Sequence, residues 1–168
     1  MTRLRRSVRR EAALPVIGAI VLAYPPVRSH RAQVSEPAAV ALGTGIGFVL
    51  FAILARERGL PRLGSRAVAA FPFVAVRAAA EECVWRRGLL LALAPRLGSG
   101  GASAVSSFAF ATAHGLDQTA RQFTVRAALG AVFAATFLTT GLLGAITAHS
   151  VYNTLVVGAL ASRSVERR

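Results

Sequence analysis

Apolar segments recur along this chain at lengths that suit helices in a bilayer, and this repetition limits the folds open to it. Short polar stretches rich in arginine, glycine and proline separate them. A bilayer core accepts helices and closed barrels only, because every backbone polar group there must find its hydrogen bond within the protein. The sequence therefore predicts an all-α fold, a polytopic transmembrane helical bundle of about six spans, at residues 12–24, 38–54, 67–94, 102–116, 127–138 and 142–161.

Composition supports this class. Of the 168 residues 54% are hydrophobic, and the mean hydropathy is +0.54, values typical of a membrane protein. The first apolar segment follows a basic N-terminus, as in a signal peptide, but no small-residue cleavage site stands clear before Pro25. We therefore expect it to be a retained span.

Arginine supplies all twenty basic residues, and the formal net charge is +13. Such a charge can indicate nucleic-acid binding, but here most arginines flank the apolar segments, which indicates lipid contact and no nucleic-acid partner. With six spans, fourteen arginines fall on one side of the membrane and only Arg28, Arg31 and Arg96 on the other. The positive-inside rule then places both termini in the cytoplasm. The alanine- and arginine-rich, lysine-free composition is typical of a high-GC bacterium, so we expect an integral protein of a bacterial cell membrane.

Connections and contacts between the spans are also predicted. Gly43, Gly45 and Gly47 would allow a neighbouring helix to approach the second span closely. Residues 95–101 are expected to form a turn, residues 139–141 to end the fifth span, and Arg121 and Arg126 to lie in a basic loop before it.

Charged residues interrupt one apolar segment, 78–93, where Glu81, Glu82, Arg86 and Arg87 occur. Each charged side chain at a bilayer centre costs at least about 2.5–3.5 kcal/mol, so such a group is a functional-site hypothesis by default. Arg77 and Glu81 are four residues apart, as are Glu82 and Arg86, so each pair shares a helix face and can form an ion pair.

Two later spans carry polar pairs at the same spacing, Phe110 with His114 and His149 with Asn153. Three helices can therefore bring a carboxylate, two imidazoles and an amide into one cavity. Peptide hydrolysis needs such a set: a general base for water, a proton carrier and donors for the oxyanion. Glu81, His114 and His149 are also a suitable ligand set for zinc, with one position open for water. The residues alone leave both readings open.

The motifs EECVWR, FATAH and HSVYN occur in this order on successive predicted helices, and they resemble the CPBP intramembrane proteases, relatives of the type II CAAX prenyl endopeptidase and of bacteriocin-processing and immunity proteins. The resemblance implies a glutamic-type peptidase, historically classed with the metalloproteases, that needs no cofactor, with zinc as the alternative. It implies that Glu81 activates water with His114, that His149 and Asn153 stabilise the oxyanion, and that Glu82, Arg86 and Phe110 support them.

The resemblance also implies a division of the chain. Residues 67–162 would be the catalytic core, preceded by a basic N-terminus and two peripheral spans in 1–66 and followed by a basic cytoplasmic tail in 163–168. The function expected is intramembrane cleavage of a membrane-associated or secreted peptide or protein. CAAX cleavage itself is not expected to carry over, because a bacterium of this composition is not expected to contain prenylated CAAX proteins. The alternative is a non-catalytic membrane immunity protein or a proton-coupled transporter that uses the same polar residues.

Overall fold

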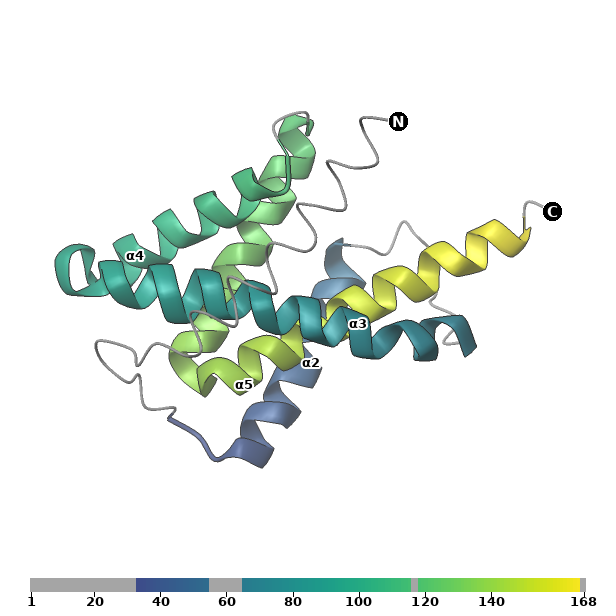
Figure 1. Ribbon diagram of the computed structural model, residues 1–168, viewed down its shortest axis with the longest axis horizontal. Coiled ribbons are helices and arrows are strands. Elements are labelled where there is room, and N and C mark those ends of the chain that lie inside the picture. Colours follow the sequence, from purple (N-terminus) through teal and green to yellow (C-terminus); the bar gives the residue numbers. More distant parts are fainter. Residues whose placement is uncertain (1–32, 55–64, 116–117, 167–168) are drawn as a thin grey trace.

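The computed structural model describes residues 33–54, 65–115 and 118–166, and all regular secondary structure in these ranges is helical (Figure 1). The all-α prediction is confirmed for this part of the chain, whereas the predicted span 12–24 lies outside the described residues. The elements are α2 (Glu36–Leu54), α3 (Ser65–Glu82), the π-helix η2 (Cys83–Leu90), α4 (Leu91–Ala113) and α5 (Ala120–Glu166).

Within the described residues, two helices are long and apolar enough to cross a membrane: α2, and α5 over Ala120–Ala161. Together with large outward-facing apolar side chains such as Ile53, Phe73 and Phe108, they suit a lipid environment. The number of six spans stays a prediction.

Two glycines break the long helices. Gly98 in α4 has φ 68° and Gly141 in α5 has φ 77°, a backbone region that glycine adopts at little cost. The break at Gly141 agrees with the predicted end of the fifth span. The predicted turn at 95–101 is narrower than expected, because helix α4 continues through Pro95 and leaves helical geometry only at Gly98.

Helix α5 begins at Ala120, seven residues before the predicted start at 127. The prediction was wrong because it overlooked a capping box in the sequence Thr119-Ala-Arg-Gln122. The Thr119 hydroxyl accepts the Gln122 backbone N–H at 3.2 Å, and the Gln122 side chain accepts the Thr119 N–H at 2.9 Å. Arg121 and Arg126 therefore project from a helix and not from a loop.

Helices α2 and α5 approach each other closely through small residues. A Cβ atom at Gly47 would lie 2.7 Å from the Ala148 carbonyl oxygen, and one at Gly43 would meet the Gly144 carbonyl oxygen. The close contact expected at these two glycines is confirmed. Gly45 was expected to share it, but it faces open space with nothing within 4 Å, because it points away from α5.

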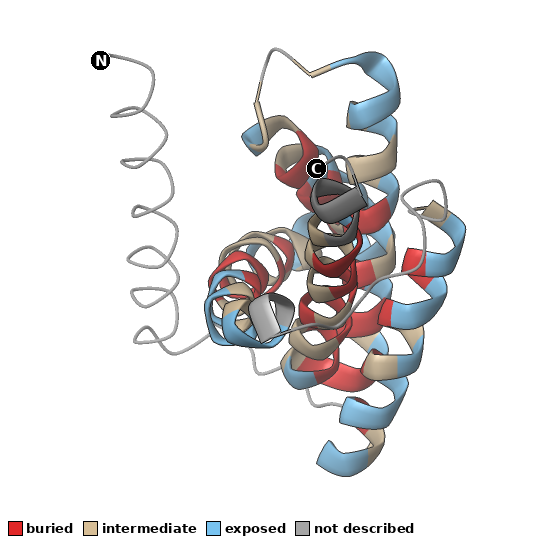
Figure 2. Ribbon diagram, turned by 90° about the vertical axis from the view of Figure 1, so that its right-hand side faces the viewer, coloured by how far each residue is buried: buried red, intermediate tan, exposed pale blue. Residues whose placement is uncertain are grey.

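Helix α5 contacts α2, α3, η2 and α4 and so forms the centre of the described bundle (Figure 1). The buried residues lie on the helix faces that meet it (Figure 2). One apolar cluster includes Phe51, Phe133 and Leu155, and another includes Leu90 and Phe137. Buried polar side chains accompany these clusters, and four of them belong to the candidate site: Glu81, Glu82, Arg86 and His149.

Candidate active site

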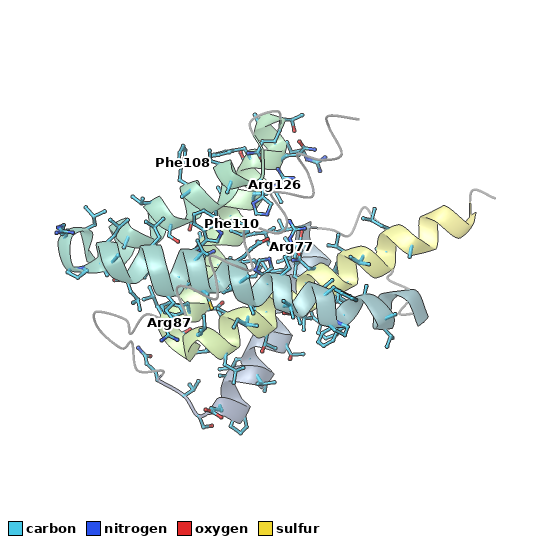
Figure 3. The ribbon with its side chains drawn as sticks, in the orientation of Figure 1. Arg77, Arg87, Phe108, Phe110 and Arg126 are labelled. Carbon is cyan, nitrogen blue, oxygen red and sulfur yellow. The ribbon has the colours of Figure 1, made fainter. Side chains whose placement is uncertain are left out.

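A cavity of about 560 Å³ opens among the end of α2, α3, the end of α4 and both parts of α5. Five of the residues predicted from the motifs line it: Glu81, Phe110, His114, His149 and Asn153. The other two, Glu82 and Arg86, are fully buried and are not among its lining residues. In Figure 3, Arg77, Phe110 and Arg126 of the cavity lining lie together near the middle of the molecule, whereas Arg87 lies apart from them.

The Glu81 carboxylate is only 2% exposed. Its Oε1 accepts a hydrogen bond from Arg77 Nε at 3.0 Å. Its Oε2 is buried and has no hydrogen-bond partner among the described residues, and it lies 3.8 Å from His114 Nε2 and 3.8 Å from His149 Nε2. These separations are too long for direct hydrogen bonds, but a water molecule about 2.8 Å from each atom can bridge them.

His114 is the C-cap residue of α4. Its Nδ1 lies 2.7 Å from the Phe110 carbonyl oxygen, which can only accept, so Nδ1 carries the hydrogen. In the neutral imidazole, Nε2 therefore presents a lone pair towards Glu81. The ring packs against that of Phe110, with centroids 4.5 Å apart.

His149 is held in the same tautomer by a different acceptor. Its Nδ1 lies 2.9 Å from Glu82 Oε1, and Glu82 Oε2 accepts Arg86 Nε at 3.1 Å. Because the Arg86 guanidinium pairs with this carboxylate, we assign Glu82 as ionised and Nδ1 as the donor. The imidazole also stacks on Phe133, with centroids 4.5 Å apart and planes 17° apart, which fixes the direction of Nε2.

Arg86 is anchored beyond its ion pair. Its NH1 group donates to Ser106 Oγ at 2.7 Å, and Ser106 Oγ donates to the Trp85 carbonyl at 2.7 Å. The guanidinium also lies over the Phe110 ring, 5.5 Å from its centroid. The ion pair predicted from the spacing is therefore present and is tied to α4.

Asn153 follows His149 by one helical turn and lines the same cavity. Its side chain is partly exposed and makes no hydrogen bond with the described residues. The amide is therefore available to a ligand in the cavity.

Sequence reasoning missed three features of this site. Ser106 is four residues before Phe110, and this spacing on one helix face would have indicated it. Phe133 lies in a uniformly apolar segment and gave no signal. The π-helix η2 starts directly after Glu82. Such helices are rare in proteins, but those that occur are often found at functional sites. Residues 83–90 have no sequence pattern that distinguishes a π-helix from an α-helix.

The zinc alternative has a suitable set of donor types but not a suitable spacing. In tetrahedral zinc sites with bonds of 2.0–2.1 Å, ligand atoms lie about 3.3 Å apart, whereas Glu81 Oε2 lies 3.8 Å from each imidazole nitrogen. Among the residues that the structure describes, no group of three or more His, Cys, Asp or Glu side chains is arranged to hold a metal ion.

Comparison with known families gives a match over the candidate site. The type II CAAX prenyl endopeptidase Rce1-like family matches residues 63–155, more than half of the 168-residue chain. The comparisons with curated proteins and with solved structures give no match. The matched range contains all seven motif residues of the site, and the family implies a protease with a peptide or protein substrate. The family match and the apolar helices α2 and α5 together indicate an integral membrane protein. The chain belongs to the type II CAAX prenyl endopeptidase Rce1-like family.

Proposed function

We propose that this protein is an intramembrane endopeptidase that hydrolyses a peptide bond with a water molecule activated by Glu81. The observation that carries the proposal is the position of Glu81 Oε2. This oxygen is buried, has no hydrogen-bond partner among the described residues, and lies 3.8 Å from Nε2 of both His114 and His149 at the cavity.

The protonation of the three groups favours a water molecule between them. With both Nδ1 atoms acting as donors elsewhere, neutral His114 and His149 offer only lone pairs at Nε2, and ionised Glu81 offers another. Acceptors without a donor attract a molecule that brings protons. Water brings two, so it donates to two of the three atoms at a time, and a lone pair of its oxygen remains for a substrate in the cavity.

In the proposed reaction, the water oxygen forms a bond with the carbonyl carbon of the substrate while Glu81 takes a proton. His114 receives this proton and delivers it to the amide nitrogen as the C–N bond breaks, so the products are a carboxylic acid and an amine. General acid–base catalysis of this kind contributes about 10²–10⁴-fold to a rate.

Asn153 and His149 are proposed to stabilise the oxyanion that forms during attack. The Asn153 amide can donate directly. His149 donates after its Nε2 has taken up a proton from the water-filled cavity as the oxyanion forms, and it returns this proton when the C–N bond breaks, so the overall balance is unchanged. The Glu82 carboxylate on Nδ1 stabilises the imidazolium and keeps its orientation. Each such donor contributes about 10²–10³-fold to kcat.

The proposed substrate is a membrane-associated or secreted peptide or protein. Apolar side chains from α3 and α5, among them Val74, Leu129 and Val156, line much of the cavity. Leu54 ends α2, and His114 caps α4, so the cavity lies at the ends of these helices. On the predicted topology those ends face the cytoplasm, and cleavage takes place in the cytoplasmic half of the bilayer.

The test uses purified protein in proteoliposomes with a library of membrane-inserted peptides, and mass spectrometry identifies any new termini. We expect defined cleavage by the wild type and at least about a 100-fold loss in His149→Ala. Equal cleavage by both proteins, or cleavage by neither, would contradict the proposal. If neither protein cleaves a peptide, proton flux across the same vesicles tests the rival function, a proton-coupled transporter. Flux that requires Glu81 but not Asn153 would support the transporter function.

A further inference from the structure

Arg77 lies one helical turn before Glu81 on α3 and contacts the carboxylate to which we assign base catalysis. Its Nε donates to Glu81 Oε1 at 3.0 Å, and its side chain is 51% exposed and lines the cavity. It stands outside the three motifs, and the proposed chemistry gives it no step.

This hydrogen bond is the one tether of the Glu81 carboxylate in the described part of the chain. Rotation about the last side-chain bond of a glutamate is soft, and a half-turn only exchanges two equivalent oxygens, whereas intermediate angles turn both of them aside. Holding one oxygen at Arg77 therefore fixes the plane of the carboxylate so that the other oxygen faces the imidazoles. That other oxygen, Oε2, is the atom 3.8 Å from both Nε2 atoms.

The second ion pair, between Glu82 at the end of α3 and Arg86 in η2, has a different environment. Glu82 and Arg86 are fully buried, and both make further hydrogen bonds, to His149 and to Ser106. Arg77 differs because half of its side chain is accessible and its bond to Glu81 is at the cavity. The Arg77 guanidinium is therefore not held beside Glu81 by burial in the protein core.

We propose that Arg77 is a positioning residue for catalysis: it holds Oε1 of Glu81 and so directs Oε2 towards His114 and His149. This inference rests on the proposed function. Without the tether, the carboxylate plane would rotate through angles at which neither oxygen meets the attacking water, and kcat would fall while substrate binding remained.

The experiment compares wild type with Arg77→Ala and Arg77→Lys in proteoliposomes, on any peptide that the wild type cleaves. We expect kcat of Arg77→Ala to fall about 10- to 100-fold, the size of effect that misplacement of a reacting group produces, with KM within about twofold. Arg77→Lys should retain an intermediate kcat because its ammonium can still reach the carboxylate.

Chemical rescue separates positioning from a purely structural role. Because the Arg77 side chain is half exposed at the cavity, millimolar guanidinium can enter the space that Arg77→Ala vacates, and we expect it to restore kcat at least severalfold. Urea, a neutral molecule of the same shape, should not. Arg96→Ala is the matched control: Arg96 is exposed and does not line the cavity, so its kcat should equal that of wild type with and without guanidinium.

An unchanged kcat in Arg77→Ala would overturn the inference while leaving the proposed function intact. So would a loss that disappears when rates are divided by the folded fraction measured by gel filtration, because Arg77 would then only ease insertion of Glu81. A loss that neither lysine nor guanidinium restores would overturn it as well.

If the wild type cleaves nothing, the proposed function fails by itself. The hydrogen bond between Arg77 and Glu81 is then tested by the rate at which the Arg77 Nε–H proton exchanges with solvent. Glu81→Gln should speed that exchange, and an unchanged exchange rate would overturn the inference.

Discussion

Glu82 Oε1 accepts the His149 Nδ1 hydrogen at 2.9 Å, although 67 residues separate the two in the sequence. This buried bond joins the end of α3 to the second part of α5 and places His149 beside the glutamate pair. It gives Glu82 two tasks, since its other oxygen pairs with Arg86 at 3.1 Å. The orientation of His149 thus depends on a carboxylate that does not itself line the cavity.

Replacing Glu82 tests this dependence. Glu82→Ala would leave the Arg86 charge buried without its carboxylate, a change that destabilises by about 3–5 kcal/mol. We expect this loss in the free energy of unfolding, measured by chemical denaturation in detergent micelles.

The double variant Glu82→Ala/Arg86→Met removes both charges and should recover part of that stability, because no unpaired buried charge remains. It should nevertheless stay catalytically impaired, since His149 Nδ1 has lost its acceptor. A double variant as unstable as the single one, or one with wild-type kcat, would contradict this account of Glu82.

The close contact between α2 and α5 predicts different tolerance at neighbouring glycines. A Cβ atom at Gly47 would lie 2.7 Å from the Ala148 carbonyl oxygen, so Gly47→Ala should lower the free energy of unfolding by about 1–3 kcal/mol, as overpacking does. Gly45→Ala is the matched control on the same helix, and we expect no loss because nothing lies within 4 Å. Equal effects of the two substitutions would show that this contact does not set stability.

Asn153 distinguishes oxyanion stabilisation from a proton relay. We expect Asn153→Ala to lower kcat by about 10²–10³-fold, the effect of losing one oxyanion donor, with little change in KM. Gln122→Ala serves as the control, because Gln122 also lines the cavity but belongs to the cap of α5. Wild-type kcat in Asn153→Ala would remove this residue from the mechanism.

The capping box at the start of α5 gives a prediction about stability. Thr119→Val removes the hydroxyl that accepts the Gln122 N–H, which should cost about 0.5–2 kcal/mol. Thr124→Val is the control, since the exposed Thr124 hydroxyl only donates to a carbonyl one turn earlier, and its effect should stay below about 0.5 kcal/mol. Thermal unfolding of the two variants in the same detergent decides the point.

Local patterns were sufficient to predict much of this molecule. The i to i+4 spacing indicated the ion pairs Arg77–Glu81 and Glu82–Arg86, and both are present. The spacing of His114 and His149 within their motifs indicated that they could share a cavity with Glu81, and they do line one. A helix break at Gly141 was predicted because two threonines and a glycine interrupt an apolar segment there. These features depend on a few neighbouring residues.

Other features depend on contacts between distant segments and could not be predicted in this way. The Glu82–His149 bond and the stacking of Phe133 on His149 arise only when α5 packs against the other helices. Gly45 and Gly47 look alike in sequence, but only the position of α5 makes one of them intolerant of a side chain. The early start of α5 is a different case, because the Thr119–Gln122 signal was available and was overlooked.

The most direct test of the central claim is the single-turnover rate of peptide cleavage by wild type and by Glu81→Gln, in proteoliposomes, with and without a zinc chelator. Glu36→Gln is the matched control, because Glu36 is exposed in the first turn of α2. We predict that wild type and Glu36→Gln cleave equally and resist the chelator, and that Glu81→Gln is slower by at least about 100-fold. Cleavage by Glu81→Gln at the wild-type rate would contradict the role of Glu81, and loss of wild-type cleavage on chelation would contradict a reaction that needs no metal.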